Sequence, residues 1–147
     1  MSLRDQLIRH EGLRLKPYTD TVGKLTIGVD RNLTDRGISK AEAMHLLDND
    51  ILEAQTAVVK ALPWTVEIDR PRFEILMNMA FNLGIGGLLK FERFLAAVQE
   101  GSYELAALEM LNSKWAKQVG QRADELASMM RTGIDPFPKS SGGERTG

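Results

Sequence analysis

The chain has 147 residues, of which 43% are hydrophobic and 27% charged, and its formal net charge is −1; these values are typical of one globular domain large enough for a core and a cleft. A charge this close to zero gives no general attraction to nucleic acid, and no apolar run reaches the length of a membrane span. The absence of cysteine excludes disulfides and zinc–thiolate sites, and the two histidines lie too far apart in the chain for a metal cluster.

A short helix is predicted over residues 3–11. Ser2 and Asp5 have the spacing of a variant capping box, and Gly12 is expected to end the helix. The apolar stripe of this helix consists of Leu3, Leu7 and Ile8. Glu11 lies on the line of this stripe, so we expect its carboxylate to be partly buried.

Residues 17–29 change to a period of two, which predicts a β-hairpin with its turn at residues 22–24. Strands are expected only within residues 15–35. One face of the second strand is apolar, with Leu25, Ile27 and Val29. The opposite face is expected to be polar and open, with Thr26, Gly28 and Asp30.

The rest of the chain has the pattern of helices. Ser39 and Glu42 form a capping box that begins a helix of roughly 20 residues, which runs toward Pro63. An apolar, central helix is predicted from Arg70–Pro71 to Leu83–Gly84. Further helices are predicted over residues 88–99, 103–112 and 121–131.

These elements predict an α+β fold, mainly α, with a small β-hairpin lobe joined by the long helix to a helical lobe. We expect residues 1–138 to form this single domain, with the small lobe at about residues 13–59 and the helical lobe at residues 1–12 and 60–138. An extended substrate would bind in a cleft between the lobes. Residues 139–147 contain no apolar side chain and are expected to be a flexible tail.

Glu11 and Asp20 are the carboxylates that point to chemistry. Burial of Glu11 and the negative end of its helix would both disfavour the ionised form, so this group could keep a proton and deliver it. Asp20 lies near the hairpin turn, where we expect it to be solvated and ionised. A protonated carboxyl group opposite an ionised one is the requirement for glycoside hydrolysis.

Thr26 would complete this pair. If residues 22–24 form a three-residue loop, Asp20 and Thr26 become cross-strand neighbours that can hold a nucleophilic water between carboxylate and hydroxyl. The residues alone leave a plainer interpretation open, in which Asp20 stabilises a turn and Glu11 is an ordinary surface residue.

The stretch from Glu11 to Val29 resembles the signature of the T-even and lambdoid phage lysozymes, which belong to glycoside hydrolase family 24. The signature consists of a Glu, an Asp nine residues later and a Thr six residues after that. The resemblance continues through segments that span nearly the whole chain: Phe81–Gly84, Ser113–Trp115, Gln121–Ala123 and Met130–Gly133.

The resemblance implies a two-lobed lysozyme-like fold and a role for each matching residue. Glu11 would be the general acid, Asp20 the base or electrostatic stabiliser, and Thr26 the residue that positions water. Arg122 would support the site by pairing with Glu11. Substrate binding is assigned to Gly28, Asp30, Asn32, Phe81 and Asn82. The family inverts the anomeric centre and requires no metal or cofactor.

The chain departs from the family at Asp30–Arg31, where members have Gly-His or a similar pair. If the strand continued, Asp30 would lie on the face of Thr26, where a third carboxylate could hinder the sugar. Alternatively, Asp30 and Arg31 neutralise each other at a strand end, because Asp tolerates turn conformations.

The sequence therefore predicts an inverting N-acetylmuramidase that cleaves the 1,4-β bond between N-acetylmuramic acid and N-acetylglucosamine in bacterial peptidoglycan. We expect a phage endolysin that lyses the host, acts as a monomer and binds glycan strands but no nucleic acid. Without a signal peptide it would stay in the host cytoplasm and act in the periplasm or cell wall after release. The alternatives are a tail-associated or effector lysozyme, a peptidoglycan-binding protein with a dead site, and a lytic transglycosylase, which would need neither Asp20 nor Thr26.

Overall fold

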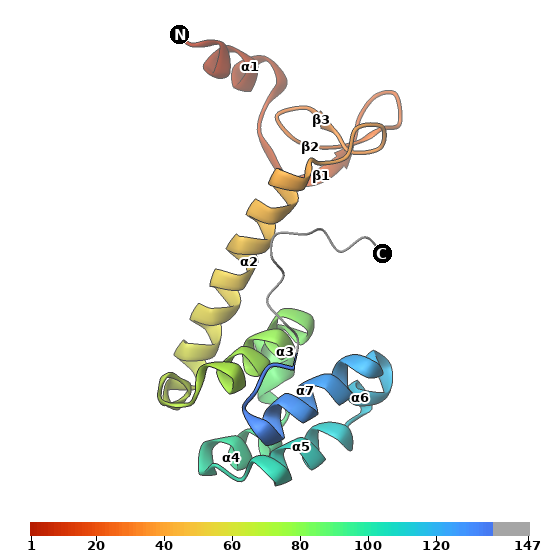
Figure 1. The fold of residues 1–147 in the computed structure, drawn as a ribbon. Coiled ribbons are helices and arrows are strands. Elements are labelled where there is room, and N and C mark those ends of the chain that lie inside the picture. The colour runs from red at the N-terminus through yellow and green to blue at the C-terminus, as the bar shows by residue number, and fades with distance from the viewer. Residues whose placement is uncertain (137–147) are drawn as a thin grey trace. The chain divides into compact units, whose positions relative to one another are not determined.

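A computed structural model describes residues 1–136 of the chain, which are mainly helical with one small antiparallel sheet (Figure 1). The chain divides into two compact units, Met1–Asp48 and the residues from Asn49 onward, whose relative positions are not determined. The predicted α+β, mainly α fold class is confirmed. The predicted assignment of residues 1–12 to the helical lobe stays a prediction, and the predicted tail lies outside the described residues.

The first unit begins with helix α1 (Leu3–Glu11), which the sequence predicted with the same bounds. The capping box is present, because the Ser2 hydroxyl accepts from the Asp5 backbone at 3.1 Å and the Asp5 carboxylate accepts from the Ser2 backbone at 3.4 Å. The structure shows no buried residue in α1. The expectation that its apolar stripe faces a core is therefore not met within this unit.

Three strands follow in the order β1 (Arg14–Thr19), β2 (Leu25–Gly28) and β3 (Arg31–Asn32), each antiparallel to the next. The first pair is in register at Tyr18 with Thr26, and the second at Thr26 with Asn32. The predicted hairpin is confirmed, while the third short strand is an addition to it.

Helix α2 (Lys40–Ala61) begins in the first unit and ends in the second. Its predicted capping box is confirmed: the Glu42 backbone donates to the Ser39 hydroxyl at 3.1 Å, and the Ser39 backbone donates to Glu42 Oε1 at 2.8 Å. No described helix is long and apolar enough to cross a membrane.

The second unit is helical and contains the hydrophobic core. Its elements after α2 are η1 (Pro63–Glu67), α3 (Arg70–Leu89), α4 (Glu92–Glu100), α5 (Tyr103–Leu111), α6 (Lys114–Val119) and α7 (Gln121–Thr132). The buried apolar side chains of the described residues run from Val58 to Met130 along the chain, and α3 contributes more of them than any other helix. The short elements η1 and α6 were not predicted from the sequence.

Gly84 interrupts α3. Its φ of 75° and ψ of 160° are not helical, and the helix resumes for the residues up to Leu89. The predicted end of the first part of this helix, at Leu83–Gly84, is confirmed. The predicted helix over residues 88–99 instead begins at Glu92, because the chain first completes the second part of α3.

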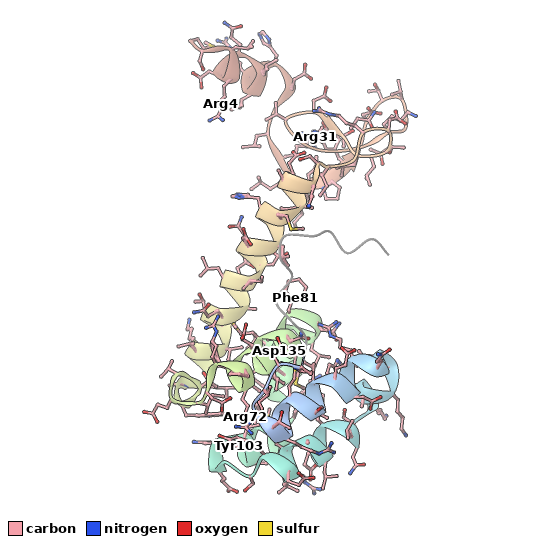
Figure 2. The ribbon with its side chains drawn as sticks, in the orientation of Figure 1. Arg4, Arg31, Arg72, Phe81, Tyr103 and Asp135 are labelled. Atoms are coloured by element: carbon pink, nitrogen blue, oxygen red, sulfur yellow. The ribbon has the colours of Figure 1, made fainter. Side chains whose placement is uncertain are left out.

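Arg72 ties three helices of the second unit together (Figure 2). From α3 it donates to the carbonyl oxygens of Met130 and Arg131 at 2.7 and 3.0 Å, near the end of α7. Its guanidinium also lies 3.5 Å from the ring centre of Tyr103 in α5. Arg72 thereby satisfies carbonyl groups that a helix end leaves without partners.

Candidate active site

Glu11 is the last residue of α1 and is exposed. The backbone N–H of Gly12 closes the helix by donating to the Ile8 carbonyl at 2.8 Å. The expected partial burial of Glu11 is wrong within its own unit, since the helix buries no residue there. Its place at the negative end of the helix dipole, directly before a glycine with positive φ, agrees with the prediction.

Asp20 shapes the hairpin turn. Its Oδ1 accepts from the backbone of Val22 at 3.0 Å and from that of Lys24 at 2.8 Å, while its own backbone N–H donates to the Lys24 carbonyl at 2.9 Å. These bonds fix the carboxylate relative to the turn. Its Oδ2 accepts no hydrogen bond from any described residue.

The predicted pairing of Asp20 with Thr26 is wrong. The turn spans residues 20–24 rather than 22–24, so Thr26 faces Tyr18 instead. Because alternate residues of a strand share a face, Asp20 is a diagonal neighbour of Thr26, a relation that usually separates Cα atoms by about 7 to 8 Å.

Thr26 is buried, with a relative exposure of 1%, whereas Leu25 beside it is 45% exposed. The expectation that Thr26 lies on an open face and Leu25 on a covered one is therefore wrong. The Thr26 hydroxyl donates to the Lys24 carbonyl at 3.1 Å. The hydroxyl can therefore only accept a hydrogen bond from a water molecule.

The chain turns at Gly28 and Asp30 instead of continuing as a strand. Both have positive φ, 69° and 58°, and β3 returns with Arg31 beside Ile27. The predicted placement of Asp30 along the face of Thr26 is wrong, because alternation ends with β2 at Gly28. Asp is among the few side chains that tolerate this conformation.

Arg31 does not neutralise Asp30 either. It donates to Glu42 Oε1 at 2.7 Å and to the Gly37 carbonyl at 3.3 Å. Hydrogen bonds from Arg31 and Ser39 hold the pKa of Glu42 at about 2, below its ordinary value, and Glu42 raises the pKa of Arg31. This ion pair joins β3 to α2, and it could not be predicted from the sequence, where only the capping position of Glu42 is visible.

Asn32, a predicted substrate-binding residue, uses its side chain within the sheet lobe. Its Oδ1 accepts from the Asp35 backbone at 2.9 Å, and its Nδ2 donates to the Asp35 carboxylate at 3.0 Å. Asp35 in turn pairs with Lys24 at 3.2 Å. This network ties the loop after β3 to the loop that Asp20 shapes.

Phe81 and Asn82 lie together on α3 in the second unit. Phe81 is labelled in Figure 2, is 48% exposed, and lines a groove of about 430 Å³. The other lining residues are Asp50, Glu53, Ala54, Ala57, Ala80 and Ile85. Asn82 Oδ1 accepts from the indole Nε1 of Trp115 at 2.7 Å, and Trp115 is buried in the core.

Arg122 is half-exposed on α7 and binds Asn78 of α3. Its Nε and Nη2 donate to Asn78 Oδ1 at 3.0 and 2.7 Å, and Nη2 also donates to the Asn78 carbonyl at 3.3 Å. The predicted pair of Arg122 with Glu11 joins residues of different units and stays a prediction. Sequence reasoning missed Asn78, although it lies one helical turn before Asn82.

A helix that ends in a glutamate, a hairpin turn built around an aspartate and a long helix leading into an all-helical unit define the class of lysozyme-like α+β proteins. The model of the phage lysozyme family matches residues 8–131. The chain belongs to the phage lysozyme family. Membership of this family supports a function of the muramidase type, the hydrolysis of peptidoglycan.

Several relatives share this region. The chain is 32% identical over 161 residues to the pre-baseplate central spike protein Gp5 of Enterobacteria phage T4, covering 90% of this chain and 28% of that protein. It is 27% identical to probable T4-type lysozyme 2 of Dictyostelium discoideum, covering 90% of this chain and 95% of that protein. It is 34% identical to the endolysin of Bacillus phage B103, covering 76% of this chain and 43% of that protein.

Proposed function

We propose that the chain is an inverting N-acetylmuramidase that cleaves the 1,4-β bond between N-acetylmuramic acid and N-acetylglucosamine, with Glu11 as general acid and Asp20 as base. The observation that carries the proposal is the state of the Asp20 carboxylate. One oxygen is fixed by two backbone N–H groups, and the other accepts no hydrogen bond from a described residue. A fixed carboxylate with one open oxygen is suited to take a proton from water.

In the proposed reaction, Glu11 gives its proton to the glycosidic oxygen as the bond from that oxygen to the anomeric carbon breaks. A water attacks the anomeric carbon from the opposite face and loses one proton to Asp20 Oδ2. Thr26 accepts the other water proton in a hydrogen bond, because its own proton is donated to the Lys24 carbonyl. This arrangement points a lone pair of the water toward the sugar.

The remaining site residues support this reaction in our proposal. Arg122 has a supporting role, as the resemblance to the family implies. Phe81 offers an exposed aromatic face to a sugar, while Gly28, Asp30 and Asn32 shape the edge of the site beside Thr26. Asn82 can donate from Nδ2 to a sugar oxygen, since its Oδ1 is bound to Trp115.

We propose the biological role of a phage endolysin that acts as a monomer, is held in the host cytoplasm and reaches the cell wall after release. The relative from Bacillus phage B103, which is named an endolysin, supports this role. Lysis timing after deletion of the gene from its phage tests it: delayed or absent lysis supports an endolysin, and unchanged lysis contradicts it.

A pair of matched variants tests the assignment of Glu11. Glu11→Gln removes the proton, whereas Glu100→Gln makes the same change at the end of α4, which also has nine residues and is also followed by a glycine with positive φ. We expect the rate of peptidoglycan hydrolysis to fall about 10² to 10⁴-fold for Glu11→Gln and to stay unchanged for Glu100→Gln. Retained turnover in Glu11→Gln would contradict the assignment.

A further inference from the structure

One peptide unit, that between Lys24 and Leu25, connects the turn at Asp20 to the loop after β3. Its carbonyl oxygen accepts from the Thr26 hydroxyl at 3.1 Å and from the backbone N–H of Asp20 at 2.9 Å. Its N–H group donates to the Thr34 hydroxyl at 2.8 Å. Because a peptide unit is planar, an acceptor that holds its N–H also fixes the direction of its carbonyl. All of these residues belong to the first unit.

The Thr34 hydroxyl takes the place of a backbone acceptor. Leu33 donates from its backbone N–H to the Leu25 carbonyl at 2.7 Å, and in a regular antiparallel pair the Leu33 carbonyl would accept from Leu25 in return. That carbonyl instead accepts from the backbone N–H of Gly37 at 3.1 Å, because the chain turns after β3. The hydrogen bond that orients the peptide unit therefore depends on one side chain, and a single substitution can remove it.

A second contact between the same two segments is weaker. Lys24 Nζ pairs with Asp35 at 3.2 Å, but the two side chains are 38% and 56% exposed. An exposed ion pair stabilises little, because water and salt screen its charges. The pair is also made by the end of a long side chain and does not contact the peptide unit. The Thr34 hydroxyl, which binds the peptide unit itself, is therefore the contact that orients it.

The direction of the Lys24 carbonyl matters most for Thr26. Thr26 is buried and donates its proton to this carbonyl, so the carbonyl determines where the lone pairs of the hydroxyl point. The carboxylate of Asp20 depends on it less, because the N–H groups of Val22 and Lys24 that bind this carboxylate belong to other peptide units.

We propose that Thr34 is a positioning residue, which sets the direction of the Lys24 carbonyl and thereby aims the Thr26 hydroxyl at the attacking water. The proposal rests on the proposed function, in which Thr26 accepts a hydrogen bond from that water. Thr34 then acts through the peptide unit rather than on the sugar or the reacting atoms.

The test compares Thr34→Val, which removes the hydroxyl and keeps the shape of the side chain, with Thr34→Ser, which keeps the hydroxyl. Thr56→Val is the matched control, because Thr56 is also exposed and its hydroxyl donates one hydrogen bond, to the Leu52 carbonyl at 2.8 Å. We expect Thr34→Val to lower kcat for peptidoglycan hydrolysis about tenfold with little change in KM, because a displaced hydroxyl misplaces the water and not the sugar. Thr34→Ser and Thr56→Val should keep the wild-type kcat.

Amide hydrogen exchange at Leu25 tests the contact without any need for activity. The exchange rate should rise about fivefold in Thr34→Val, the size expected for the loss of one hydrogen bond, and should stay unchanged in Thr34→Ser. A double-mutant cycle then separates positioning from a structural role. In the Thr26→Val background, Thr34→Val should cost no further kcat, because the hydroxyl that it aims is gone.

Additive losses in this cycle, full kcat in Thr26→Val or Thr34→Val, or an unchanged exchange rate at Leu25 in Thr34→Val would overturn the proposal. Failure of the proposed function is distinguishable, since Glu11→Gln would then retain turnover while the exchange rate at Leu25 still responded to Thr34→Val.

Discussion

Asp20 combines two roles that one pair of substitutions can separate. Its Oδ1 closes the hairpin turn through two backbone N–H groups, while its Oδ2 is the proposed base. Asp20→Ala removes both functions. Asp20→Asn keeps an acceptor oxygen for the turn but removes the negative charge and the ability to take a proton.

The expected magnitudes follow from the two hydrogen bonds of 3.0 and 2.8 Å. Hydrogen bonds to charged acceptors contribute about 1.5 to 3 kcal/mol each, and the half-exposed position of Asp20 lowers this to about 1 kcal/mol each. Asp20→Ala should therefore lower the free energy of unfolding by about 2 kcal/mol and Tm by roughly 4 to 8 °C. Asp20→Asn should cost less than about 1 kcal/mol, because neutral hydrogen bonds replace the charged ones.

Activity and stability are then expected to diverge. Both variants should lose on the order of 10²-fold or more in the rate of dye release from labelled peptidoglycan. Thermal unfolding followed by circular dichroism gives the stability, with Asp48→Ala as control for removal of an exposed carboxylate from the same unit. Equal Tm values for Asp20→Ala and Asp20→Asn would refute the turn argument, and an active Asp20→Asn would refute the base.

Three further outcomes follow from the geometry. Gly84→Ala should cost about 1 to 3 kcal/mol in chemical unfolding, because its φ of 75° and ψ of 160° are accessible essentially to glycine alone; a neutral effect would mean that the break in α3 needs no glycine. Arg31 and Ser39 lower the pKa of Glu42 to about 2. The stabilisation that the ionised Glu42 contributes is therefore complete above pH 4.5, the ordinary pKa of this carboxyl group, and is lost as the pH falls toward 2. The Tm difference between wild type and Glu42→Gln should shrink over that window, and a constant difference would exclude the ion pair as its cause. Asn82→Leu leaves the buried Trp115 N–H without its acceptor and should cost about 1 to 3 kcal/mol, and unchanged stability in urea unfolding would show that this N–H finds another partner.

The helix starts could be predicted well from the sequence because their signals are local. The capping boxes at Ser2 and Ser39 use side chains three residues from the residues they bind, so spacing alone identifies them. The position of Glu11 at the end of α1 follows from the same local pattern and the glycine after it.

The hairpin register could not be predicted, because a side chain decides it. Asp20 accepts from Val22 and Lys24, which extends the turn to residues 20–24 and shifts the partner of Thr26 to Tyr18. A register shift in a strand changes which residues face each other along its whole length. The wrong placement of Asp30 has a related origin, since period-two alternation gives no sign of where a strand ends.

The long-range polar contacts also could not be predicted from the sequence pattern. Asn78 lies 44 residues from Arg122, and Asn82 lies 33 residues from Trp115. A polar residue on an apolar helix does not by itself indicate which distant side chain it binds. The short helix α6 lacks enough turns to show a period, so its side chains could be placed only in the structure.

The products of purified peptidoglycan, analysed by mass spectrometry, test the central claim most directly. A muramidase that activates water through Asp20 releases muropeptides that end in reducing N-acetylmuramic acid, with one water added per bond cleaved. We expect these products from the wild type and none from Glu11→Gln. Products that end in anhydro-N-acetylmuramic acid would show a transglycosylase, and the absence of any released muropeptide would show a binding protein; either result would contradict the account.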